Sequence, residues 1–159
     1  MLIYGEWIRE IWLRRRESMS TKKVMLVVDD EKEVHELIKA YLPSSAFEIY
    51  SATNGEEGIR LYRKLMEENK RPDLVVMDLN LSGSTAFEAA KRQMEGKELD
   101  GVKTTREIME LDPEADVVGF TAYAHLDWAR RLKALGVKEV FGREIGFDGF
   151  AKKVVETLA

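Results

Sequence analysis

Short runs of uninterrupted apolar residues alternate along the chain with longer stretches in which apolar residues recur every three or four positions. An unbroken apolar run is typical of a strand covered on both faces, whereas spacing of three and four is typical of an amphipathic helix. The two most apolar runs predict buried strands over residues 24–28 and 74–77. Weaker runs predict further strands over 47–51, 116–120 and 138–141.

Helical spacing fills the intervals between these strands. It predicts helices over 32–42, 55–69, 85–95, 101–111, 126–135 and 147–158. Asn54 is a suitable N-cap for the second of these helices, and Gly136 suits the turn that follows the fifth. Strands that alternate with helices indicate an α/β fold built on a parallel sheet.

The first 23 residues differ in character from the rest of the chain. Apolar residues recur there at helical spacing, at Ile3, Trp7, Ile8, Ile11 and Trp12. A basic run over 14–16 follows them, which reverses the order found in a secretory signal. We therefore expect residues 1–23 to form a basic amphipathic N-terminal helix ahead of a main domain over 24–159. Its apolar stripe needs burial, either against that domain or against a second copy in a homodimer.

Composition narrows the chemistry open to the chain. It has no Cys, which excludes disulfides and thiolate sites, and its two His residues, His35 and His125, are expected to be surface or half-buried residues rather than metal ligands. A formal net charge of −4 gives no general case for nucleic-acid binding, and no apolar stretch reaches the length of a membrane span. With 159 residues, 45% of them hydrophobic, we expect one packed cytoplasmic domain.

Three aspartates directly follow the two most apolar strands. Asp29 and Asp30 come after 24–28, and Asp78 comes after 74–77. Because ligands of open parallel sheets bind at the carboxyl ends of the strands, we expect the three carboxylates to share a pocket. Like charges at close range favour a bound cation, and an all-oxygen site suits Mg²⁺. A carboxylate beside such an ion can also attack a phosphoryl group and form an aspartyl phosphate.

Two further strands end in residues that suit the same chemistry. Thr121 offers a hydroxyl donor, and Arg143 offers cationic donors for phosphate oxygens. A single Asp after an apolar strand is more often a cap or turn residue than a ligand. Three of them, joined by Thr121 and Arg143 at other strand ends, argue against coincidence.

The order of these motifs resembles the receiver domain of two-component response regulators. The matching segments are VMLVVDDE (24–31), VVMDLNLSG (75–83), DG (100–101), DVVGFTAYA (116–124) and GVKEVFGRE (136–144). The resemblance implies a flavodoxin-like, doubly wound five-stranded parallel sheet with strand order 2-1-3-4-5. Here the fold would carry an extra N-terminal helix and an inserted helical segment after the third strand.

The same resemblance implies roles for individual residues. Asp78 matches the phosphoacceptor, and Asp29 and Asp30 match the acidic pair that binds Mg²⁺. The metal would also be held by Asp78 itself and by the backbone carbonyl of Asn80. Thr121 matches the switch hydroxyl that moves toward the phosphoryl group.

The implied function is that of a stand-alone, chemotaxis-regulator-like receiver. A histidine kinase or phosphotransfer protein would pass a phosphoryl group to Asp78, and the switched protein would control an unknown partner protein. Such a protein is not an enzyme beyond self-phosphotransfer and autodephosphorylation. No DNA-binding domain is expected in this sequence, so output would be a protein contact or onward phosphotransfer unless the sequence is a piece of a larger protein.

Three positions depart from the family pattern. Arg143 replaces the usual Lys, Glu144 replaces the Pro after it, and Val140 stands where an aromatic switch residue is usual. Arg is longer, planar and forked, so its exchange for Lys is not conservative. These departures motivate an alternative, a receiver-like binding module that is never phosphorylated.

Other protein classes fit the sequence less well. A phosphatase of the haloacid dehalogenase type needs a second Asp two residues after the nucleophile, and Asn80 stands there instead. A flavin carrier on the same fold would need a Ser/Thr/Gly-rich phosphate loop after the first strand, which this sequence lacks.

The loop after Asp78 is longer than the family pattern. The Asp-Gly pair that usually opens the third helix soon after the phosphoacceptor stands only at 100–101, and 85–86 hold Thr and Ala instead. Either 85–95 or 101–111 could be the family's third helix. We favour the second register, which makes about 85–99 an insertion beside the proposed site.

Overall fold

Five strands and the helices between them make up most of the described chain. The computed structural model describes residues 6, 8–10, 22–81, 87–88, 91, 94–95, 99–122, 124 and 127–158. The strands are β1 (Lys23–Val28), β2 (Phe47–Ala52), β3 (Leu74–Met77), β4 (Val117–Thr121) and β5 (Glu139–Gly142). The helices are α2 (Lys32–Tyr41), α3 (Gly55–Glu67), α5 (Asp100–Leu111), α6 (Asp127–Ala134), the 3₁₀ helix η1 (Arg143–Ile145) and α7 (Gly146–Leu158). No helix within these ranges is long and apolar enough to cross a membrane.

The strands form one parallel sheet in the order β2-β1-β3-β4-β5. The predicted doubly wound, flavodoxin-like topology is therefore confirmed. Val28, the last residue of β1, lies opposite Ala52 of β2 and Met77 of β3. Because these three strands end level with one another, the residues that follow them reach the same edge of the sheet.

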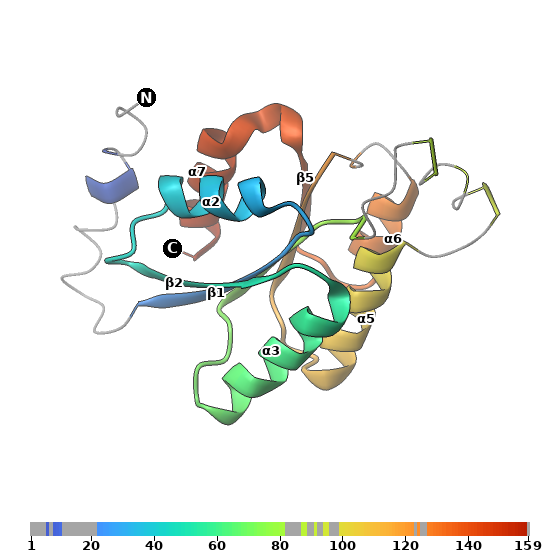
Figure 1. Cartoon of the computed structure of the whole chain (residues 1–159), viewed down its shortest axis with the longest axis horizontal. Coiled ribbons are helices and arrows are strands. Elements are labelled where there is room, and N and C mark those ends of the chain that lie inside the picture. Colours follow the sequence, from blue (N-terminus) through green and yellow to red (C-terminus); the bar gives the residue numbers. More distant parts are fainter. Residues whose placement is uncertain are drawn as a thin grey trace.

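Helices cover both faces of the sheet, α2 and α7 on one face and α3, α5 and α6 on the other (Figure 1). Leu26 and Val28 of β1 pack in the layer of α3, α5 and α6, whereas Met25 and Val27 pack in the layer of α2 and α7. Successive strand residues point to opposite faces, so a strand covered on both sides needs apolar residues throughout. This is the physical reason for the unbroken apolar run in β1.

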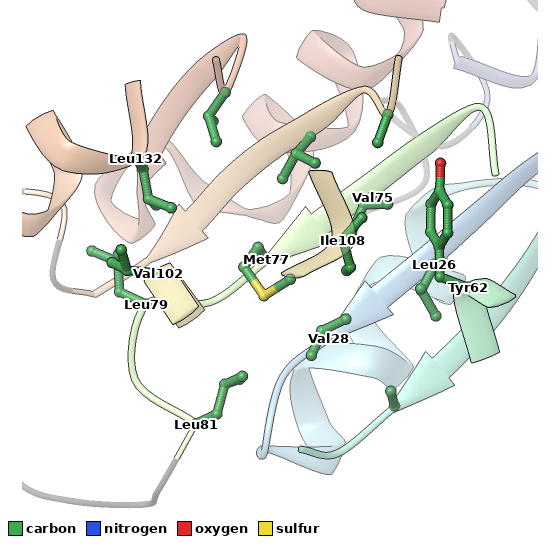
Figure 2. Close-up of a cluster of buried hydrophobic side chains, with 14 of the residues drawn as sticks. Leu26, Val28, Tyr62, Val75, Met77, Leu79, Leu81, Val102, Ile108 and Leu132 are labelled. Carbon is green, nitrogen blue, oxygen red and sulfur yellow. The ribbon is translucent and has the colours of Figure 1, made fainter. Parts of the chain in front are cut away.

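Figure 2 shows the layer formed with α3, α5 and α6. Sheet residues meet helix residues there, namely Leu26, Val28, Val75, Met77, Tyr62, Val102, Ile108 and Leu132. Most of these side chains have no exposed surface. Burying each such side chain stabilises the fold by about 1.5–3 kcal/mol. The layer therefore anchors β1 and β3, which carry the aspartates.

The ends of α3 and α6 agree with the cap and turn residues predicted from the sequence, whereas β4 and β5 each end one residue later than predicted. Asn54 caps α3, with its side chain accepting the Glu57 N–H at 2.8 Å, and Gly136 follows α6 with φ of +107°. Thr121 lies inside β4 rather than after it, because it pairs with Gly142 of β5. β5 is correspondingly shifted by one residue, and Arg143 opens η1.

Part of the N-terminal segment packs against the main domain. Glu6, Ile8, Arg9 and Glu10 are helical, and Ile8 is fully buried. Its neighbours belong to the layer of α2 and α7, which includes Ile38, Leu42 and Phe47. The other residues of the predicted apolar stripe and the basic run over 14–16 lie outside the described residues.

The start of α5 lies against the backbone of the residue that follows β3. The Gly101 N–H donates to the Leu79 carbonyl at 2.8 Å. A Cβ atom at position 101 would lie 1.9 Å from the Asp78 carbonyl oxygen and 2.7 Å from the Leu79 Cα. Only glycine fits this approach, so the geometry favours α5 as the helix that the Asp-Gly pair opens. Most of the preceding segment over 85–99 lies outside the described residues.

Candidate functional site

Asp29 and Asp78 lie side by side at the carboxyl edge of the sheet. The Asp29 N–H donates to the Ala52 carbonyl at 3.0 Å, and the Asp78 N–H donates to the Val28 carbonyl at 3.1 Å. These bonds continue the parallel ladders one residue beyond the strands, so the sheet itself holds both backbones. The two side chains are almost fully buried, Asp29 at 2% and Asp78 at 4% exposure. The predicted convergence of these carboxylates is present in the structure.

Thr121 is joined to Asp78 by a direct hydrogen bond. Its hydroxyl Oγ1 donates to Asp78 Oδ1 at 2.5 Å, and the residue has no exposed surface. The bond joins the end of β4 to the end of β3, the neighbouring strand. The Thr121 hydroxyl is therefore directed at the carboxylate that the sequence pattern singles out as the phosphoacceptor.

Arg143 is bound to Asp29. Its Nη2 donates to Asp29 Oδ2 at 2.8 Å and to the Phe120 carbonyl at 3.2 Å. The guanidinium carbon also lies 4.7 Å from the centre of the Phe120 ring. Phosphate oxygens are the partners that the sequence predicts for this side chain, whereas in the structure it is held by Asp29 and Phe120.

Glu31 and Asp30 extend the carboxylate group toward solvent. The Glu31 N–H donates to Asp29 Oδ1 at 2.9 Å, which turns the chain after β1. Carboxylate oxygens of Asp29, Asp30 and Glu31 can all lie within 4.8 Å of one another. Glu31 was not among the expected ligands. Asp78 stands outside this group of three carboxylates. Asn80, whose backbone carbonyl was the fourth expected ligand, is 3% exposed.

Burial sets the protonation behaviour of the two inner carboxyls. Burial, and after it the charge of Asp29, raise the pKa of Asp78 to about 7, against the lowering effects of the Thr121 hydrogen bond and Arg143. Burial also raises the pKa of Asp29, against the lowering effects of the Glu31 N–H and Arg143. A cation near both groups would stabilise their charged forms.

The donor set fits a hard divalent cation such as Mg²⁺. Its side-chain ligands are carboxylates, the groups that Mg²⁺ prefers in proteins. Asp29 and Asp78 are buried and have raised pKa values. The protein itself therefore does not fully stabilise their negative charges, and a bound cation would do so. Asp29 and Asp30 therefore suit the metal role assigned to them, and Glu31 is a further candidate.

His35 is a buried residue that supports the site and that the sequence did not indicate. The expectation of a surface or half-buried residue is wrong, since His35 on α2 is 6% exposed. Its Nε2 lies 2.7 Å from the Asp29 carbonyl oxygen. A carbonyl can only accept, so Nε2 carries the proton and supports the Asp29 backbone. Its partner is a backbone atom, which leaves no signal in the sequence.

Val140 and Phe141 occupy opposite faces of β5. Val140 lies opposite Gly119 of β4 and packs against the layer of α3, α5 and α6. Phe141 packs in the layer of α2 and α7, with its ring edge-on to Phe150 at 6.3 Å. Position 140, where the family pattern has an aromatic residue, thus carries an aliphatic side chain, and Thr121 pairs instead with Gly142.

Comparisons with known proteins agree with this geometry. The response regulator receiver domain model matches residues 25–154. The virulence sensor protein BvgS of Bordetella pertussis is 30% identical over 135 residues, which is 85% of this chain. The chain spans only 10% of the length of that sensor. Sporulation initiation phosphotransferase F of Bacillus subtilis is 25% identical over 140 residues, or 88% of this chain and 96% of that protein.

Solved structures share the same fold. The CheX-CheY-BeF3-Mg²⁺ complex of Borrelia burgdorferi contains a chain that matches with a TM-score of 0.68 and 20% identity, over 86% of this chain and 90% of that one. A likeness at this identity concerns the fold, whereas the family model covers the sequence motifs as well. The chain belongs to the response regulator receiver domain family of two-component systems.

Proposed function

We propose that the protein accepts a phosphoryl group on Asp78 from a histidine kinase or a phosphotransfer protein. The observation that carries this proposal is the buried Asp78 carboxyl, which lies beside Asp29 and accepts a hydrogen bond from Thr121. Membership in the receiver family supports the same role. A cytoplasmic location, where such kinases present their phosphohistidines, is part of the proposal.

Each residue of the site has a part in the proposed transfer. An oxygen of Asp78 forms the new bond to phosphorus as the bond between phosphorus and the donor nitrogen breaks, and the imidazole leaves with that electron pair. Asp29 and Asp30, with the Asn80 carbonyl, would hold Mg²⁺, which when bound neutralises charge on the phosphoryl oxygens. Thr121 would donate its hydroxyl to the phosphoryl group on Asp78. Arg143 supplies a positive side chain in direct contact with Asp29.

We further propose two additions to the receiver. The N-terminal segment forms a helix that packs on the layer of α2 and α7, which the helical residues 8–10 and the burial of Ile8 support. This helix ends before the predicted residue 23, because Lys23 already belongs to β1. Residues of about 85–99 form an insertion, which the contact of Gly101 with the backbone of Asp78 and Leu79 supports. Both would distinguish the output of this protein from that of a shorter receiver.

Phosphorylation with a small donor tests the main proposal. The protein is incubated with acetyl phosphate and MgCl₂, and its intact mass is measured. We expect a fraction of the wild type to gain one phosphoryl group, and the D78N variant to gain none. The matched control, D116N, removes a carboxylate from the segment just before β4, at the other end of the strands, and should be labelled like wild type. A wild type that gains no mass, or a D78N variant that still does, would overturn the proposal.

A non-phosphorylated binding module is the second candidate function. The observation that favours it is the ion pair of Arg143 with Asp29, since a cation site already filled by a guanidinium would have little use for Mg²⁺. Titration with MgCl₂, followed by tryptophan fluorescence, separates the two candidates. A phosphoacceptor site should respond, and a site used only for protein contact should not.

A further inference from the structure

The Arg143–Asp29 pair is much less hydrated than an ordinary surface ion pair. The Asp29 side chain is 3% exposed and that of Arg143 is 22% exposed. Charge-assisted hydrogen bonds are stronger than neutral ones, and a partly buried pair is weakly screened by salt. The guanidinium therefore binds the carboxylate that the proposed metal also requires.

Two contacts with Phe120 hold the guanidinium in this position. Nη2 donates to the Phe120 carbonyl, and the cation lies over the face of the Phe120 ring. The Nε of Arg143 is buried and has no hydrogen-bond partner among the described atoms. The orientation of the side chain thus depends on Asp29 and Phe120. A lysine ammonium has no planar group that could stack on the ring while its neighbouring nitrogen binds the acid.

Phe120 connects this position to α7. Its ring stacks on Phe150 with centroids 4.1 Å apart and planes 9° from parallel, and Phe147 meets it edge-on at 5.3 Å. Thr121, the next residue of β4, points the other way and binds Asp78. Adjacent strand residues thus bind the proposed phosphoacceptor on one side and the α7 aromatics on the other. Arg143 touches both Asp29 and Phe120, and so bridges the two sides.

We propose that Arg143 is a positioning residue that competes with the divalent cation for Asp29, and that its displacement is transmitted through Phe120 to the aromatic rings of α7. This inference rests on the proposed function, because it requires cation binding at Asp29. The contacts of Arg143 and Phe120 would connect the Asp29 site to α7 without an aromatic side chain at position 140, where this chain has Val140. Binding of the cation and the contact of Arg143 with Phe120 are then thermodynamically linked in both directions.

Calorimetric titration of the full chain with MgCl₂ measures the competition. R143Q removes the competing charge, and we expect it to bind Mg²⁺ about tenfold more tightly than wild type, the value of one charge-assisted hydrogen bond. F120L keeps both charges and removes the ring beneath the guanidinium, so we expect roughly threefold tighter binding. R130Q is the matched control, because it removes the same charge from an arginine whose side chain is 88% exposed.

Aromatic NMR spectra of the same proteins measure the transmission. Addition of MgCl₂ to wild type should shift the ring resonances of Phe120, Phe147 and Phe150, and these shifts should be lost in R143Q. If Mg²⁺ binds to wild type and R143Q with affinities within twofold, or leaves the three rings unchanged, the inference is refuted while the proposed function stands. If neither wild type nor any variant binds Mg²⁺, the metal-dependent function itself is refuted.

Discussion

Substitution of Gly101 by alanine tests the packing that supports Asp78. In the structure the added Cβ would lie 1.9 Å from the Asp78 carbonyl oxygen and 2.7 Å from the Leu79 Cα. Both obstacles are backbone atoms, so no side-chain rotation can relieve the overlap. The start of α5 must move away from β3, or the backbone that carries Asp78 must move instead.

The size of the effect follows from two opposing contributions. Overpacking against a rigid neighbour costs about 1–3 kcal/mol, and more where the backbone must shift. Alanine in a helix recovers at most about 1 kcal/mol relative to glycine. We therefore expect G101A to lower the free energy of unfolding by about 2 kcal/mol, which corresponds to about 4–8 °C in Tm for a chain of this size.

Gly149 in α7 provides the matched control. A Cβ there would meet only the Ile145 side chain, at 3.4 Å and beyond, which is an ordinary contact. G149A should therefore raise stability by about 0.5–1 kcal/mol through helix propensity alone. Thermal and urea unfolding of both variants, followed by circular dichroism, measure the difference.

The same variants also report on the site. Displacement of the Asp78 backbone should slow labelling by acetyl phosphate roughly tenfold or more in G101A, since reactions at such sites depend on placement within about 1 Å. G149A should be labelled at the wild-type rate. If G101A is as stable as wild type, the close approach of α5 to Asp78 is wrong, and with it the argument that Gly is required there.

Two further predictions concern the charge of Asp78 and the N-terminal segment. Burial raises the pKa of Asp78 to about 7, so the folded state binds more protons than the unfolded state between about pH 4 and 7, and stability falls as the pH rises through that window. In EDTA at pH 8, D78N should therefore be about 2–4 kcal/mol more stable than wild type by urea unfolding, with the difference vanishing near pH 4; equal stability at pH 8 would contradict the raised pKa. I8A should lose about 2–4 kcal/mol because Ile8 is fully buried, whereas E10A, at an exposed position, should stay within about 0.5 kcal/mol of wild type. An I8A variant that unfolds like wild type would show that the segment does not pack on α2 and α7.

Much of the fold could be predicted because its signals are local. The apolar runs of β1 and β3 follow from burial on both faces, and the helical spacing between them follows from one buried face. Asn54 caps α3 with its own side chain, and Gly136 adopts a positive φ after α6, so both could be predicted from the residue type.

The partners of individual side chains could not be predicted in the same way. Arg143 follows β5 as expected, yet its contacts with Asp29 and Phe120 join residues more than twenty positions apart. His35 binds the backbone carbonyl of Asp29. Every residue has a backbone carbonyl, so the residue type at position 29 does not indicate this contact. Glu31 joins the acidic group only because the chain turns after β1.

The sequence by itself determined the order of the five strands and, to within one residue, where they end, because apolar periodicity and residue type act over a few neighbouring positions. It thereby placed Asp29, Asp78 and Thr121 at one edge of the sheet. Only the tertiary structure decided that Arg143 binds Asp29, that Phe120 joins it to α7, and that α5 begins against the backbone of Asp78. These contacts depend on the distances between strands and helices that are far apart in the chain. Those distances are set by the packing of the two layers and not by the local sequence pattern.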